Sequence, residues 1–125
     1  MTLDPHDEQK TPKKDFIVKQ GATFTRVIKF RDKTTETLLS LDGLVSALLF
    51  ARPDNNTEPI EVTTDGPAEQ KITIDYTNKK IIVFIADEVT NGYSWGTAPY
   101  RFEVTDSAGN VLRRLRGFLT LEKKV

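Results

Sequence analysis

The residues that could carry catalytic or metal chemistry are few in this chain, and they are scattered along it. The one histidine, His6, stands close to three carboxylates, Asp4, Asp7 and Glu8. Imidazole and carboxylate groups are metal ligands, but a short polar terminal segment does not hold them in a fixed arrangement, so we do not expect a metal site there. Because the chain has no cysteine, disulfides, thiolate metal sites and cysteine nucleophiles are excluded.

No acid–base pair or nucleophile is placed for catalysis. A Ser–His–Asp triad needs a histidine held within the fold, and His6 lies near the N-terminus. Asp87 and Glu88 are adjacent and Asp75 precedes a turn, but nothing places two carboxylates across a cleft, as glycoside hydrolysis requires. The glycines fall in turn-like stretches and not in a phosphate-binding loop. We therefore expect a protein that is not an enzyme and has no cofactor.

Two groups of residues could instead serve binding. Tyr93, Trp95 and Tyr100 surround a bend that contains glycine, and an exposed aromatic shelf there could stack on a sugar or anchor a protein partner. The other interpretation is that Trp95 closes one end of the core, which the usual burial of large aromatic side chains favours.

The second group is basic. Arg113, Arg114 and Arg116 lie on one expected strand, and Lys123 and Lys124 follow it. Such a strand is explained either as a sheet edge protected by charge or as an interface with an acidic neighbour. Nucleic-acid binding would require a net positive charge, whereas the formal net charge of this chain is +0.

Composition indicates one domain with its own core. The chain has 125 residues, of which 38% are hydrophobic and 29% charged. The N-terminal sequence lacks the basic-then-apolar pattern of a signal peptide. The longest apolar runs, 81–86 and 47–51, are too short to span a bilayer. We expect no membrane partner and synthesis in the cytoplasm.

Alternating apolar and polar residues predict β-strands along most of the chain. The clearest case is 98–122, where two alternating stretches flank the turn-like run 106–110 and predict a β-hairpin. A second hairpin is expected from 72–76 and 81–85, a buried strand from 44–52, and one helical turn at 86–92. The spacing predicts an all-β fold, an immunoglobulin-like antiparallel β-sandwich of about seven or eight strands. Residues 1–14 are expected to be a flexible N-terminal arm, and 15–125 the sandwich domain.

The sequence from 15 to 125 resembles a known group of proteins. The opening DFIVKQGATFTRVIKF (15–30) has an apolar run, a Gln-Gly pair with a small residue, and an alternating strand. The closing PYRFEVTDSAGNV (99–111) and RGFLTL (116–121) give a Tyr-containing strand, a small-Gly turn and a strand with an internal glycine. These features resemble small β-sandwich structural proteins from the tail modules of tailed bacteriophages. That group includes tail collar proteins and the N-terminal domains of baseplate upper proteins.

The resemblance implies a non-enzymatic structural protein of the virion, made in the bacterial host cytoplasm. It would assemble in multiple copies at the distal tail and contact the tail tube protein and the tail fibres, which it anchors. The expected contact regions are the N-terminal arm, the strand with Arg113, Arg114 and Arg116, and the bend with Tyr93 and Trp95. Two alternatives stay open: a carbohydrate-binding module in which Trp95 and Tyr93 stack on host glycans, and a head-decoration protein.

Overall fold

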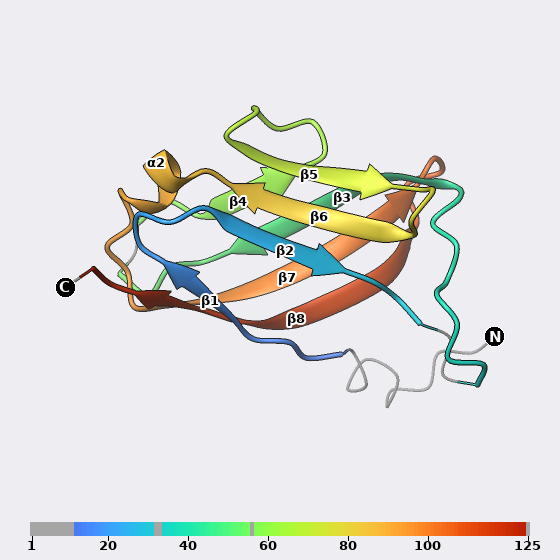
Figure 1. Cartoon of the computed structure of the whole chain (residues 1–125), viewed down its shortest axis with the longest axis horizontal. Coiled ribbons are helices and arrows are strands. Elements are labelled where there is room, and N and C mark those ends of the chain that lie inside the picture. Colours follow the sequence, from blue (N-terminus) through green and yellow to red (C-terminus); the bar gives the residue numbers. More distant parts are fainter. Residues whose placement is uncertain (1–11, 32–33, 56, 125) are drawn as a thin grey trace.

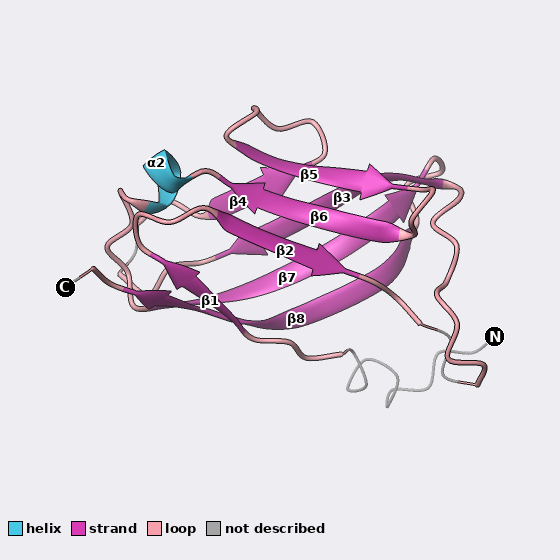
Figure 2. Ribbon diagram, in the orientation of Figure 1, coloured by secondary structure: helices cyan, strands magenta, loops and turns pink. Residues whose placement is uncertain are grey.

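β-Strands are the main secondary structure in the parts of the chain that the structure, a computed structural model, describes: residues 12–31, 34–55 and 57–124 (Figure 1). Figure 2 shows that the one helical turn among these residues sits at one end of the strands. The strands are β1 (Phe16–Lys19), β2 (Phe24–Ile28), β3 (Leu44–Ala51), β4 (Ile60–Thr63), β5 (Gln70–Asp75), β6 (Lys80–Ile85), β7 (Thr97–Asp106) and β8 (Val111–Glu122), and the helix is α2 (Asp87–Thr90). The expected all-β class is confirmed.

All eight of these strands belong to one sheet, in the order β1-β8-β7-β3-β4-β5-β6-β2. The β1–β8 and β4–β5 pairs are parallel and the others antiparallel, so the sheet is mixed. The sheet curls until its two end strands approach each other. The Phe16 and Phe24 rings contact edge to face at 6.3 Å, and Arg26 Nη2 donates to the Ile17 carbonyl at 2.8 Å. The result is nearly a closed barrel, with Arg26 at the seam, between the buried Phe24 and Ile28 on the same side of β2.

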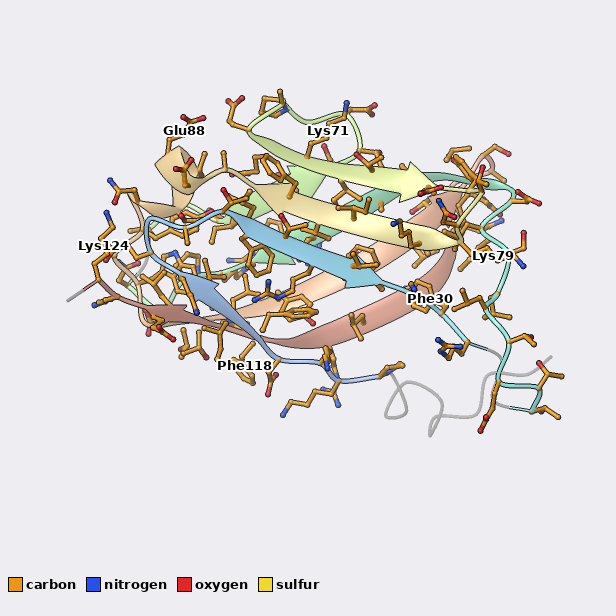
Figure 3. The ribbon with its side chains drawn as sticks, viewed as in Figure 1. Phe30, Lys71, Lys79, Glu88, Phe118 and Lys124 are labelled. Carbon is orange, nitrogen blue, oxygen red and sulfur yellow. The ribbon has the colours of Figure 1, made fainter. Side chains whose placement is uncertain are left out.

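The core fills the inside of this barrel with the alternate side chains that the sequence pattern predicts. The largest fully buried side chains are Trp95, Phe102, Leu41, Leu49, Ile72, Ile81, Ile85 and Leu119. Long aliphatic and aromatic side chains from opposite parts of the sheet meet there, while charged groups lie outside (Figure 3). Burial on this scale, at roughly 25 cal/mol per Å² of apolar surface, is the main force that holds the sheet closed.

The C-terminal hairpin is confirmed, and Asp106 shows why it turns where it does. The Asp106 carboxylate accepts hydrogen bonds from the backbone N–H groups of Ala108 and Asn110, both at 2.9 Å. Gly109 has a φ of +85°, which glycine adopts without strain.

The second hairpin, β5–β6, is also confirmed. Its turn is held by Asp75, which accepts from Asn78.

The segment before β1 lies against β8. Lys14 N–H donates to the Arg116 carbonyl at 2.8 Å, and Arg116 N–H donates to the Pro12 carbonyl at 3.1 Å. Gly117 makes this approach possible, because a Cβ atom at that position would overlap the Lys14 carbonyl oxygen. Residues 12–14, which the sequence pattern groups with the arm, therefore lie alongside the sheet. Residues 1–11 of that arm, with His6, lie outside the described part of the chain.

Candidate interaction surfaces

The strand that carries the arginines is not an edge strand. β8 lies between β7 and β1, and its residues 119–122 pair with β1 over the full length of that strand. The interpretation as charges that protect a sheet edge is therefore wrong for Arg116, which the segment before β1 covers, whereas the stretch with Arg113 and Arg114 pairs in the described part of the chain with β7 alone, so for these two residues the edge interpretation remains a prediction. Sequence pattern could not show this, because β1 reaches β8 by a parallel pairing across about a hundred residues, as the Phe16–Leu119 register shows. The Arg113 side chain is outside what the structure describes.

Outward side chains of β3, β7, β8 and the segment before β1 form one surface, which we name the arginine face. Its members are Lys13, Phe50, Arg52, Arg101, Glu103, Arg114, Arg116 and Phe118. The register places Phe50 opposite Arg101, Arg101 opposite Arg116, and Arg116 beside Lys13. A shallow hollow of about 360 Å³ lies between the arginines of β7 and β8. Of the arginines expected as contacts, Arg114 and Arg116 thus lie on one exposed surface.

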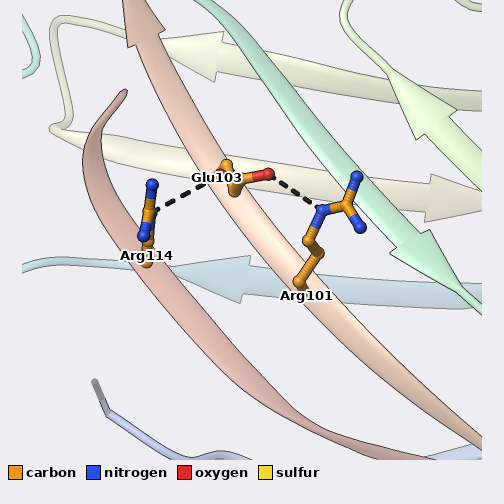
Figure 4. Close-up of polar contacts among 3 residues, drawn as sticks. All are labelled: Arg101, Glu103 and Arg114. Carbon is orange, nitrogen blue, oxygen red and sulfur yellow. Dashed lines mark hydrogen bonds and ion pairs between the residues drawn. The ribbon is translucent and has the colours of Figure 1, made fainter. Parts of the chain in front are cut away.

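The Glu103 carboxylate forms ion pairs with two of these cations (Figure 4). Arg101 Nε lies 3.0 Å from Glu103 Oε1, and Arg114 Nε lies 3.5 Å from Glu103 Oε2. Among the described residues these are the only two ion pairs. The arginine side chains stay 58% and 57% exposed, so each pair contributes about 0–1 kcal/mol. Lys13, Arg52 and Arg116 have no carboxylate partner within that part of the chain.

Two phenylalanine rings lie under three of the cations, Arg101, Arg52 and Lys13. The Arg101 and Arg52 guanidinium groups lie 4.7 and 5.4 Å from the centroid of the Phe50 ring. Lys13 Nζ lies 5.6 Å from the centroid of the Phe118 ring, and Phe118 is 44% exposed. Cation–π contacts of this kind at exposed sites contribute about 0.5–1 kcal/mol. They hold the cations flat on the sheet and leave their charge accessible.

The bend at Tyr93 and Trp95 is not an exposed aromatic shelf. Trp95 is only 2% exposed and belongs to the core, so its assignment as a contact residue is wrong and the end-plug interpretation is right. Tyr93 packs on it with ring centroids 5.3 Å apart, and burial raises the pKa of Tyr93 to about 12. The Tyr93 hydroxyl and the Trp95 indole N–H are buried and have no hydrogen-bond partner in the described ranges. A hollow of about 180 Å³ lies beside them.

Two further residues hold this end of the barrel. Asp54 accepts hydrogen bonds from the backbone N–H groups of Gly96 and Thr97, both at 2.9 Å, and these bonds lower the pKa of its carboxyl group. Tyr100 is buried, and its hydroxyl donates to the Lys14 carbonyl. Burial, with the negative charge of Asp15, raises the Tyr100 pKa. Asp54 and Tyr100 each hold a backbone segment in place, and neither side chain is aimed at a ligand.

Sequence reasoning missed a second charged surface, which we name the carboxylate side. It consists of Glu58, Glu61, Asp65, Glu69, Asp87 and Glu88, all exposed. The Ala86 N–H donates to the Glu69 carbonyl at 2.7 Å and so brings the start of α2 beside the β4–β5 loop. The side chains of these six residues form no ion pair with any residue that the structure describes. No sequence signal identifies this surface, because its members come from three separate segments.

A third surface carries no formal charge in its centre. On the outside of β2, β6 and β5, Thr25 pairs with Phe84, and Val27 pairs with Ile82, which pairs with Thr73. Val27 is 49% exposed. We name these five residues the uncharged face.

Within residues 12–31, 34–55 and 57–124, no group of three His, Cys, Asp or Glu residues could hold a metal ion. In the same ranges no helix is long and apolar enough to cross a membrane. Comparison of the chain with protein-family models and with curated proteins finds no match.

Proposed function

We propose that this chain is a non-enzymatic structural protein of a tailed bacteriophage, which assembles in multiple copies at the distal tail through the arginine face and anchors tail fibres. The observation that carries the proposal is the placement of Lys13, Arg116 and Arg101 on neighbouring strands at the same level of the sheet. Like charges directly opposite one another destabilise a sheet. Places where a local rule of stability is broken are commonly sites of function.

The composition of the face favours a protein partner. Arginine and aromatic residues are enriched at protein–protein interfaces, where they supply most of the binding energy. Here Arg101 and Arg52 lie over Phe50, and Phe118 is 44% exposed beside Lys13. An acidic protein surface would supply the carboxylates that the face lacks. The biological setting comes from the sequence resemblance to phage tail proteins.

The finer fold assignment belongs to this proposal. The curled sheet brings β5, β6 and β2 over β3, β7 and β8, so that two layers pack face to face around one core (Figure 1). Such an arrangement is compatible with the immunoglobulin-like sandwich of tail proteins.

Solution size and particle shape test the proposal. Light scattering coupled to size-exclusion chromatography is expected to show a multimer at high protein concentration, and electron microscopy to show rings or closed clusters. A strictly monomeric protein, with and without residues 1–14, would contradict it. A head-decoration protein would use the same face, and labelling of virions with an antibody against this chain separates head from tail. The carbohydrate alternative is weakened because Trp95 is buried and offers no face to a sugar ring.

A further inference from the structure

We infer that copies of this chain associate head to tail, with the arginine face of one copy against the carboxylate side of the next. This inference rests on the proposed function and names the partner of the same face. It is carried by the separation of charge within one molecule that is neutral as a whole, with a formal net charge of +0.

The two surfaces are complementary in charge. The arginine face presents Lys13, Arg52, Arg101, Arg114 and Arg116 against Glu103 and the neighbouring Asp15 and Asp54, and Asp54 is already bound to the Gly96 and Thr97 N–H groups. Asp15 is already bound to the Phe118 N–H at 2.9 Å, and Glu103 is shared by two arginines. The carboxylate side has six acidic residues and, on the same strand region, the single cation Lys71. Each surface therefore has an excess of the charge that the other lacks.

The two surfaces adjoin along the β3–β4 pair, where Glu61 lies opposite Phe50, and Glu61 is the one acidic residue of the carboxylate side that this register places beside the arginine face. The other strands diverge from there: β8, with Arg116, is the second strand of the sheet, whereas β5, which follows Glu69, is the sixth, so these charges do not neutralise each other within one copy. Figure 3 places Glu88 and Lys71 at the upper margin of the molecule and Phe118 at the lower margin. Opposite charges on different sides of one molecule are free to bind the next copy on each side.

The arrangement also selects the symmetry of the assembly. A two-fold contact centred on the arginine face would place that face against itself and bring like charges together, which is unfavourable. A head-to-tail contact pairs opposite charges at every interface. Because it is heterologous, it generates a ring when the rotation closes, or an open filament when it does not. Neither outcome requires a second kind of protein.

Two charge-reversal variants test the inference. Arg101→Glu/Arg116→Glu makes the arginine face acidic, and Glu69→Lys/Glu88→Lys makes the carboxylate side basic. Each variant alone is expected to be monomeric in light scattering, because its two surfaces then carry the same sign. An equimolar mixture of the two is expected to regain the multimer, with association that weakens as salt is raised. Lys79→Glu/Lys80→Glu, at the β5–β6 turn, is the matched control, since it changes the net charge as much as the first variant but away from both surfaces.

The outcomes separate the inference from the proposed function. If the wild type forms a multimer that neither reversal disturbs, the inference is overturned and the multi-copy function stands. The inference is also overturned if each variant alone loses the multimer and mixing does not restore it. A wild-type protein that is monomeric overturns both. Thermal unfolding of each variant, monitored by circular dichroism, confirms that a loss of association is not a loss of fold.

Discussion

The arginine face and the uncharged face are outer surfaces of the same curled sheet, yet they follow different rules. On the uncharged face, Val27 and Ile82 are paired β-branched residues, and Thr25 and Thr73 lie beside them. These residue types fit a pleated surface, and their pairing supports the strands. On the arginine face, Arg101 is opposite Arg116, which opposes the pairing of β7 with β8.

The difference distinguishes residues that are explained by the stability of the fold from residues that are explained by the binding of a partner. The uncharged face is explained by strand stability alone. The arginine face contains cations in register with a single shared carboxylate, Glu103, so stability does not explain it. We interpret this contrast as evidence of selection for binding on one side of the sheet. The predictions below test first the core that supports both faces and then the arginine face itself.

The largest effect is expected from the core. Trp95→Ala should lower the free energy of unfolding by about 3–5 kcal/mol, because it removes a large buried side chain and leaves a cavity. Chemical denaturation measures this change. Tyr93→Phe is the comparison variant, since it keeps the packed ring and removes a buried hydroxyl that has no partner in the described ranges. A stability of Trp95→Ala close to that of the wild type would mean that Trp95 is not part of the core, and the shelf interpretation would return.

A smaller loss is expected at Gly117, where the segment before β1 crosses β8. Gly117→Ala should lower the free energy of unfolding by about 1–3 kcal/mol, since the new methyl group would overlap the Lys14 carbonyl and overpacking has this effect. It should also displace Lys13 from Phe118 on the arginine face. Gly92→Ala is the control, because its nearest atom would be Val89 O at 3.6 Å. Equal stability of the two variants would show that the close approach does not exist in solution.

Asp54 gives a pH-dependent effect. Its pKa is lowered in the folded protein by hydrogen bonds from the Gly96 and Thr97 N–H groups. The carboxylate therefore adds stability at pH above its ordinary pKa of 3.8, and this contribution disappears as pH falls through the lowered value. Asp54→Asn should reduce the melting temperature at neutral pH, and the difference from the wild type should vanish in acid. A difference that is constant with pH would contradict this explanation of the bend.

Sequence alone predicted the local structure well. The hairpin between β7 and β8 is confirmed because alternation, Asp106 and Gly109 act over a short distance, and the strand and helical turn at 44–52 and 86–92 are confirmed for the same reason. Gly117 was visible only as an interruption of the pattern, and its role depends on the distant Lys14.

The strand order and the surfaces could not be predicted in this way. The pairing of β1 with β8 joins distant parts of the chain, and alternation does not record which strands are neighbours. For that reason alternation could not show that β1 covers only the end of the arginine strand and leaves its first half paired with β7 alone. The carboxylate side was missed because Glu61, Glu69 and Glu88 lie close together only after folding. From sequence alone Trp95 could be assigned either to the core or to an exposed contact surface, and its burial decides for the core.

The most direct test of the central claim is a joint measurement of stability and association in Arg116→Glu. The account predicts that the free energy of unfolding rises by about 0.2–1 kcal/mol at low salt, because the new carboxylate faces Arg101 and Lys13 across the sheet, while the multimer is lost. Arg116→Thr, which only removes the repulsion, should give a smaller gain. A variant that is less stable than the wild type and still forms the multimer would contradict the claim that the arginine face is kept for a partner.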